Sequence, residues 1–163
     1  MAEPVKTVAF VPGDVRIDTP SGLPVPRLVS LKGPKDYCRQ GPSRSHPVLF
    51  TYRRTGLPVV VVAETRDHWR KIRDPFGDEC WAFHTRLRAR SHVLAVEETP
   101  LLSAAKDGAT ERARIAPGVL TRIEKRRGDW VLIKSGHTRG WAQASAFWGV
   151  SLEQLTGGVP NSG

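Results

Sequence analysis

Cysteine and aromatic residues are scarce in this chain of 163 residues, which has two Cys and 7% Phe, Trp and Tyr. Two cysteines permit one disulfide, but they are too few for the four-ligand set of a structural zinc site. No stretch approaches the roughly 18 consecutive apolar residues that a membrane-spanning helix needs. We expect no metal site either, because the histidines show no ligand spacing: His46, His68, His84, His92 and His137.

Motifs of common enzyme classes are also missing. The chain has no Gly-rich phosphate loop, no GxSxG elbow and no pair of carboxylates in an apolar setting. We therefore expect no bound cofactor and no catalytic activity.

Acidic residues are outnumbered, with 16 Asp and Glu against 25 Lys and Arg, which gives a formal net charge of +9. Such a chain attracts anionic partners, and nucleic acid, anionic lipid and acidic cell-wall polymers all fit. No nucleic-acid-binding motif accompanies the basic clusters. Charge alone thus leaves the partner open.

The 15 Gly and 13 Pro are spread along the chain, which favours short strands and turns over long helices. We predict an all-β fold. Residues 1–27 contain five prolines and are predicted to form an extended arm or linker. Within the arm, residues 8–11 have the composition of an edge strand, and residues 151–163 are expected to be a flexible tail.

The chain repeats a pattern built around tryptophan. Trp69 and Trp81 of the first copy correspond to Trp130 and Trp141, about 60 residues later, a period typical of one small β-barrel. In each copy an apolar run leads through a charged turn into the first tryptophan, and a second turn leads to a Trp-Ala pair. We therefore predict a three-stranded meander made twice, within modules at residues 28–92 and 93–150.

The spacing within the tryptophan strands predicts which way the side chains point. Trp69 and Ile72 are three residues apart, as are Trp130 and Ile133, so the members of each pair face opposite sides of a strand. If the isoleucines lie in the core, both tryptophans lie on the outer face. There they would either wall an open groove or be covered by a loop.

These patterns resemble the bacterial SH3 (SH3b) family, and in particular exported alphaproteobacterial proteins with two such modules behind a proline-rich segment. The resemblance covers roughly residues 20–150. It is carried by these stretches in chain order: GLPVPRLVSLK at 22–32, YCRQGPS at 37–43, HPVL at 46–49, YRRTGLPV at 52–59, WRKIRD at 69–74, RGWAQ at 139–143 and FWGV at 147–150.

The resemblance implies two tandem SH3-like barrels, docked side by side, and a non-catalytic role in binding or scaffolding at the cell envelope. Two departures stand out. Cys80 occupies a position where the family usually has glycine, and the second module lacks the Arg-x-Gly-Pro signature. Too few residues remain outside the two modules to form a catalytic domain.

The resemblance also bears on the two cysteines. It implies that Cys38, in the first strand of module one, neighbours Cys80 in the closing strand, so we expect a disulfide between them. Two alternatives stay open at this point: a pair of buried free thiols, or a nucleophilic Cys38 with His68 or His84 as its base.

The first module is predicted to carry the binding surface. We expect a groove of aromatic and basic side chains that could recognise peptidoglycan or a protein partner; its candidate residues are Tyr37, Arg39, Tyr52, Trp69 and Trp81. The alternative is that Trp69 is sealed by the loop of residues 39–47 or by the other module.

The favoured location is the periplasm, since Ala2-Glu3-Pro4 suits the start of a mature exported protein and we expect a signal peptide ahead of it in the full gene. The alternative function is that of a cytoplasmic module that binds nucleic acid or another anionic polymer.

Overall fold

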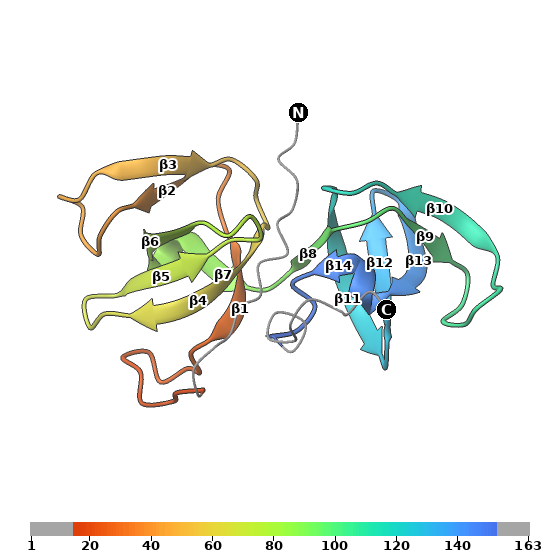
Figure 1. Ribbon diagram of the computed structural model, residues 1–163, viewed down its shortest axis with the longest axis horizontal. Helices are drawn as coiled ribbons and strands as arrows, with labels where there is room; N and C mark the ends of the chain where they lie inside the picture. Colours follow the sequence, from red (N-terminus) through yellow and green to blue (C-terminus); the bar gives the residue numbers. More distant parts are fainter. Residues whose placement is uncertain (1–14, 153–163) are drawn as a thin grey trace, which may run out of the picture.

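The computed structural model describes residues 15–152. They form two seven-stranded antiparallel sheets that lie side by side (Figure 1). The prediction of an all-β chain with two tandem small barrels is confirmed. The predicted edge strand at residues 8–11 and the tail beyond residue 152 lie outside the described residues.

The first sheet has the strand order β3-β2-β6-β5-β4-β1-β7. A single 3₁₀ turn, η1 (His84–Arg86), joins β6 to β7. The strands are β1 (Arg27–Leu31), β2 (Asp36–Arg39), β3 (Val48–Tyr52), β4 (Pro58–Glu64), β5 (Trp69–Arg73), β6 (Glu79–Phe83) and β7 (Leu87–Ala89).

The second sheet has the equivalent order, β10-β9-β13-β12-β11-β8-β14. Its 3₁₀ turn, η2 (Ala144–Ala146), joins β13 to β14. The strands are β8 (His92–Ala95), β9 (Thr99–Leu102), β10 (Glu111–Ile115), β11 (Leu120–Arg127), β12 (Trp130–Ser135), β13 (Thr138–Gln143) and β14 (Phe147–Trp148).

The predicted meander appears as β4-β5-β6 and again as β11-β12-β13. The register agrees in detail, since β4 shifts register after Val61 and β11 shifts after Ile123, in each case opposite the isoleucine of the tryptophan strand. β-Bulges are usually kept within a family, so a bulge at the same place in both copies indicates a common strand pair. The two modules are therefore two versions of one β unit.

Each barrel has its own core, and alternation along the strands supplies it. Ile72 and Ile133 are fully buried at equivalent places in the two cores. The partly buried Leu120 of module two packs against the core of module one. The two cores are thus separate, with the modules in direct contact.

A disulfide joins Cys38 to Cys80, as expected, with a Cα–Cα distance of 5.3 Å. Cys38 lies in β2, the second strand of the module rather than the first, because β1 precedes it. The bond lies next to the ladder pair of Arg39 and Trp81, which links β2 to β6. It therefore reinforces a short strand pairing.

Module two meets the same structural need with Leu101 and Gly140. The ladder pair of Leu102 and Trp141 corresponds to that of Arg39 and Trp81, so Leu101 takes the place of Cys38 and Gly140 that of Cys80. A Cβ at Gly140 would lie 2.6 Å from the Cβ of Leu101. Glycine is needed there because the leucine side chain occupies the space that a second side chain would fill.

Residues 15–26, part of the segment assigned to an extended arm, turn back on themselves. Arg16 pairs with Val25 in an isolated antiparallel bridge, and Val25 contributes to the core of module one. The turn is fastened to β4 through Glu64, which accepts hydrogen bonds from the backbone nitrogen and the hydroxyl of Ser21 at 3.2 and 2.7 Å.

Two arginines share the other carboxylate oxygen of Glu64. Nη2 of Arg27 and Nε of Arg70 each lie 2.8 Å from it, and the Glu64 side chain is fully buried. Burial would raise the pKa of Glu64, but the hydrogen bonds from Ser21 and Arg27 outweigh it and hold the pKa below its usual value. Glu64 therefore stays ionised at neutral pH.

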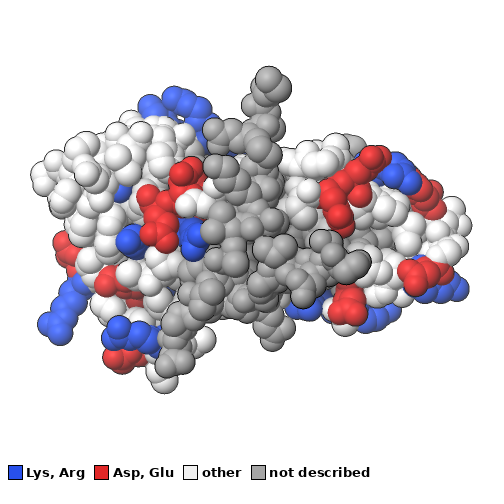
Figure 2. Space-filling model, viewed as in Figure 1, with Lys and Arg blue, Asp and Glu red and all other residues white. Residues whose placement is uncertain are grey.

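The two modules are closely joined. Ser91 donates its backbone N–H to the hydroxyl of Ser30 at 3.1 Å, and Arg54 donates to the carbonyl of Gly118 at 3.0 Å. Gly149 lies against Pro58, where a Cβ would approach to 2.9 Å. On the face viewed in Figure 2, acidic and basic side chains are interspersed over both modules.

Replacing the disulfide by the pair found in module two should preserve the first barrel. We expect Cys38→Ser/Cys80→Ser to lose about 2 to 4 kcal/mol of unfolding free energy, since it removes the cross-link and leaves polar groups in the core. Cys38→Leu/Cys80→Gly should recover part of that loss and be insensitive to dithiothreitol. Urea unfolding followed by tryptophan fluorescence measures both. If the Leu/Gly variant is no more stable than the Ser/Ser variant, the two contacts are not equivalent.

Acid should loosen the contact of residues 15–26 with β4. Because the pKa of Glu64 is lower in the folded protein than in the unfolded chain, its stabilisation is complete above the unfolded value and is lost as the pH falls through the folded value. The thermal midpoint of the wild type should therefore fall more steeply below about pH 4 than that of Glu64→Gln. Parallel pH profiles from differential scanning calorimetry would contradict this role of Glu64.

Candidate functional site

Trp69 opens β5 directly after a tight turn. The turn is closed by hydrogen bonds between the backbones of Thr65 and Trp69 and between the Thr65 hydroxyl and the Trp69 N–H, the latter at 3.1 Å. His68 adopts a left-handed conformation with φ of 74°, which is uncommon for a residue other than glycine. This geometry fixes the point at which the tryptophan leaves the turn.

Alternation places Trp69 and Ile72 on opposite faces of β5. Ile72 belongs to the core of module one, whereas Trp69 lies outside that core and packs edge-on against Phe83 of β6, with ring centroids 5.4 Å apart. Trp69 is nevertheless only 6% exposed. The side chain of Trp69 is therefore largely covered and does not wall an open groove.

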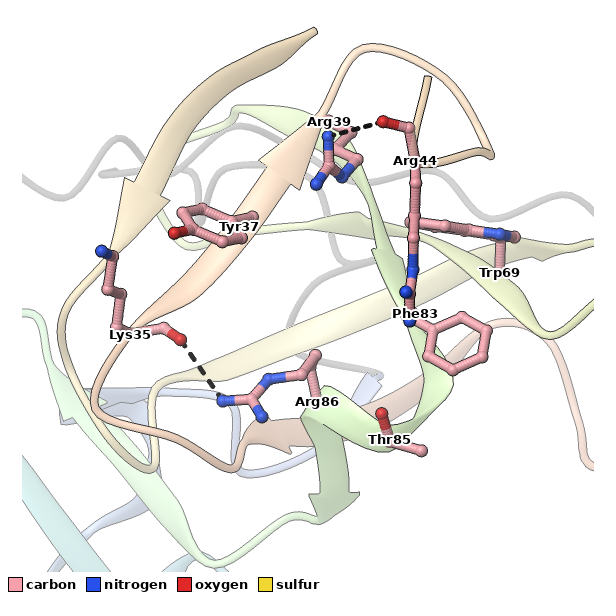
Figure 3. A pocket seen from close by; sticks show the side chains of 8 residues that line it. All are labelled: Lys35, Tyr37, Arg39, Arg44, Trp69, Phe83, Thr85 and Arg86. Atoms are coloured by element: carbon pink, nitrogen blue, oxygen red, sulfur yellow. Dashed lines mark hydrogen bonds between the residues drawn. The ribbon is translucent and has the colours of Figure 1, made fainter. Parts of the chain in front are cut away.

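A cavity of about 600 Å³ opens beside Trp69 (Figure 3). Its lining comes from β2, β5, β6, η1 and the loops that precede and follow β2. We call it the aromatic–basic pocket, and its lining residues are Lys35, Tyr37, Arg39, Arg44, Trp69, Phe83, Thr85 and Arg86. Three of the five residues predicted for a groove are thus brought together here: Tyr37, Arg39 and Trp69.

The other two predicted groove residues are not part of this lining. Tyr52 pairs with the buried Asp36 and shares its inward face, where its hydroxyl donates to Asp74 at 2.7 Å. Burial, followed by the nearby charge of Asp74, raises the pKa of Tyr52 far above its usual value. Trp81 lies on the outer face beside Arg39 and is half-buried, but it does not line the pocket.

The cations of the pocket lie against its aromatic rings. Lys35 Nζ lies 5.3 Å from the centre of the Tyr37 ring, and the Arg39 guanidinium lies 5.8 Å from the same ring. On the other side Arg44 reaches from its loop over Phe83, at 5.8 Å (Figure 3). Such contacts orient the cations while leaving N–H donors for a ligand.

Arg39 also holds the loop that carries Arg44. Its Nη1 donates to the backbone carbonyls of Arg44 and His46, at 3.1 and 3.0 Å. The Ser43 hydroxyl and His46 Nδ1 lie 2.7 Å apart within the same loop. The position of Arg44 therefore depends on a cation that itself lines the pocket.

Arg86 is fixed by a buried carboxylate. Its Nε donates to Asp36, whose side chain is 1% exposed and which also accepts from the Gly33 N–H. Nη2 of Arg86 donates to the carbonyl of Lys35 at 3.3 Å. Asp36 thus orders the segment that bears Lys35 and partly balances the positive charge of the pocket.

Sequence reasoning did not assign the other five lining residues to the groove: Lys35, Arg44, Phe83, Thr85 and Arg86. A signal for Phe83 was present, because it lies two residues after Trp81 and so shares its face of the strand. The arginines carried no such signal. Arg44 and Arg86 approach the pocket from a loop and a 3₁₀ turn, where alternation does not apply.

The equivalent positions in module two carry different chemistry. Trp130 pairs with Gln143 where Trp69 pairs with Phe83. By the same register, Leu102 replaces Arg39, Pro100 replaces Tyr37 and Ala146 replaces Arg86. Module two has one cation–aromatic contact of its own, with the Arg127 guanidinium 5.0 Å from the centre of the Trp141 ring, but it does not repeat the set of cations and rings that lines the pocket of module one.

Two histidines lie next to the pocket. The rings of His68 and His84 have centroids 4.9 Å apart, and His84 also contacts Phe83. Slight desolvation, followed by the charges of His68 and Arg70, lowers the pKa of His84 below its usual value, although the residue is exposed. The disulfide leaves Cys38 without the free thiol that a nucleophile paired with either histidine would need.

Within residues 15–152, no three His, Cys, Asp or Glu side chains gather in a way that could hold a metal ion. The same residues include no helix of the length and hydropathy required to cross a membrane.

A family profile described as "Bacterial SH3 domain" matches this chain twice, over residues 33–88 and 95–149. No curated protein matches the chain. Two solved structures from Trichomonas vaginalis are similar to part of it: NlpC2, with 14% identity and a TM-score of 0.35, and NlpC1, with 13% identity and a TM-score of 0.34.

The chain aligns over 76% of its length with each of these structures and spans about half of theirs, 48% of NlpC2 and 45% of NlpC1. Similarity at this level supports no inference about function.

Removing the charge of Asp36 should weaken the first module. We expect Asp36→Asn to lower the free energy of unfolding by about 1 to 3 kcal/mol, because a buried carboxylate loses charge-assisted hydrogen bonds from Arg86 and Gly33. Arg114→Ala is the control: that side chain is 56% exposed and forms only exposed ion pairs, so it should change stability by less than about 1 kcal/mol. Urea unfolding compares the two, and equal losses would contradict a structural role for Asp36.

Proposed function

This chain belongs to the bacterial SH3 domain family, and we propose that it is a non-catalytic binding protein of the bacterial cell envelope. In this proposal the aromatic–basic pocket of module one recognises peptidoglycan or an envelope protein. The observation that carries it is the gathering of four cationic side chains around Tyr37, Trp69 and Phe83 in that module.

The chemistry of the pocket suits a ligand that combines carboxylates with apolar groups. Arginine and lysine form charge-assisted hydrogen bonds with carboxylates, and the rings of Tyr37 and Phe83 offer apolar surface beside them. Peptide stems of peptidoglycan and acidic segments of proteins both have this composition. The pocket is also held in place before binding, since Asp36 and the loop carbonyls already orient Arg86 and Arg39.

The disulfide supports a location outside the cytoplasm. Disulfides persist in the periplasm and are rare in bacterial cytosol, where thiols are kept reduced. We propose that the protein acts in the periplasm. On the face viewed in Figure 2 acidic and basic side chains are interspersed, and the described residues of that face form no continuous basic stripe of the kind that binds nucleic acid.

Retention on purified sacculi tests this proposal. We expect the wild type to co-sediment with sacculi, and Tyr37→Ala and Arg44→Ala each to reduce the apparent affinity by about tenfold. Tyr37 is 47% exposed, so its removal should leave the fold intact. Arg112→Ala, an exposed cation of module two, is the control and should bind like the wild type.

Two results would overturn the proposal. One is the absence of retention of the wild type together with no capture of an envelope protein that Tyr37→Ala fails to capture. The other is binding to an oligonucleotide that falls about 10³-fold between 50 and 200 mM salt, with no binding to sacculi, which would favour the nucleic-acid alternative.

A further inference from the structure

The outer edge of the first sheet is formed by an uncharged strand. β3 is the last strand in the order of that sheet and pairs only with β2 among the described strands. Its sequence is VLFTY, and Val48 and Leu49 are 41% and 52% exposed. Apolar side chains on an unpaired edge are unusual, because such an edge can pair with another chain.

The equivalent edge of module two is protected by charge. β10 has the sequence ERARI, and Arg114 forms ion pairs with Glu98 and Glu111. The register shift between Glu111 and Ala113 has its counterpart at Leu49 of β3, so the bulge is common to both edges and the charges are not. Charged side chains are a usual means of preventing edge-to-edge pairing. The two copies therefore share an architecture but differ in how their edges face solvent.

Positive charge surrounds the apolar edge of module one. Arg53 and Arg54 follow β3 directly, and Arg39 lies opposite Val48 on the neighbouring strand. Within the described chain, no carboxylate forms an ion pair with any of these three arginines. Tyr37, opposite Thr51, adds an exposed ring to the same face.

We propose that β3 is the docking edge for an extended acidic peptide segment of a partner protein, which adds to the first sheet as a further strand. Main-chain hydrogen bonds to the free edge would supply affinity, and alternate side chains would supply specificity. Acidic side chains on one face of the added strand would meet Arg53 and also Arg39, which shares its face with Val48, while apolar side chains on the other face would pack beside Phe50.

An acidic partner fits this edge better than a second copy of the chain. Two copies paired through β3 would bring together two chains of net charge +9, with an Arg53-Arg54 pair at each end of the joined strands. Charge of one sign on both partners opposes association. A bulge at Leu49 interrupts the ladder with β2. The added strand would therefore pair mainly with Phe50–Tyr52, and the side chains of Val48 and Leu49 would offer it apolar contacts at the end of that pairing.

None of the residues of β3 lines the aromatic–basic pocket, although Tyr37 and Arg39 of β2 belong to both surfaces. Leu49→Asp should therefore leave retention on sacculi unchanged. The two proposals can fail separately.

The probe is a fluorescein-labelled peptide of about nine residues that alternates glutamate and valine, a length sufficient to cover one strand. Addition of the intact protein should raise the fluorescence anisotropy of the labelled peptide. Addition of the unlabelled peptide to the protein should shift the backbone amide resonances of β3. Leu49→Asp, which adds negative charge at a half-exposed position, should weaken binding at least about tenfold. Leu23→Asp is the matched control, because Leu23 is 51% exposed but lies outside the strands, in the turn of residues 15–26. This variant should bind like the wild type.

A peptide of the same sequence with every backbone nitrogen methylated distinguishes strand addition from charge attraction. It keeps the charges but has no backbone N–H donor on either edge, so it should not bind if the peptide joins the sheet. Equal binding of the methylated peptide, shifts confined to pocket residues such as Trp69, no binding at millimolar peptide, or dimerisation through β3 in place of peptide binding would each overturn the proposal.

Discussion

The contact between β2 and β6 carries much of what distinguishes the first module. Tyr37 and Arg39 on β2 form one wall of the aromatic–basic pocket, and Phe83 on β6 forms the other with Trp69. In register these two strands meet at a single ladder pair, so few hydrogen bonds hold the walls together. The Cys38–Cys80 bond crosses at this point. The geometry of the pocket, and of the β3 edge that hangs on β2, therefore depends on one covalent link between two short strands.

The two modules show how a duplicated unit can keep its architecture and change its surface. The buried isoleucines, the bulge after Val61 or Ile123 and the order of strands are common to both. Differences collect where packing does not constrain the side chain, as in the outward positions of β2 and β9. The cystine and the Leu101–Gly140 contact fill the same space by different means. Architecture thus follows from the inward residues, and recognition is decided by the outward ones.

Sequence patterns predicted the meander strands, because apolar alternation and repeated tryptophans are local signals. They also predicted that Trp69 lies on the outer face, since its distance from Ile72 along the strand sets the direction of its side chain. Tyr52 lies outside the lining of the pocket because it pairs with Asp36 and its hydroxyl bonds to Asp74, 22 residues away, which are contacts that alternation along one strand does not predict. Glu64 and its two arginines gave no local signal, as the network joins three separate segments. Contacts between distant loops, which complete the pocket with Arg44 and Arg86, lie beyond what strand periodicity can predict.

The short connection between β7 and β8 has a mechanical consequence. Only Arg90 and Ser91 separate the two strands, and Arg90 donates to the carbonyls of Gly149 and Val150 while Gly56 lies against His92. A connection of two residues that is held by contacts with both modules restricts the rotation of one barrel relative to the other. The outermost strands β3 and β10 stand at opposite ends of the molecule (Figure 1). A partner bound at β3 would consequently be held at a fixed distance and orientation from the β10 end of the molecule.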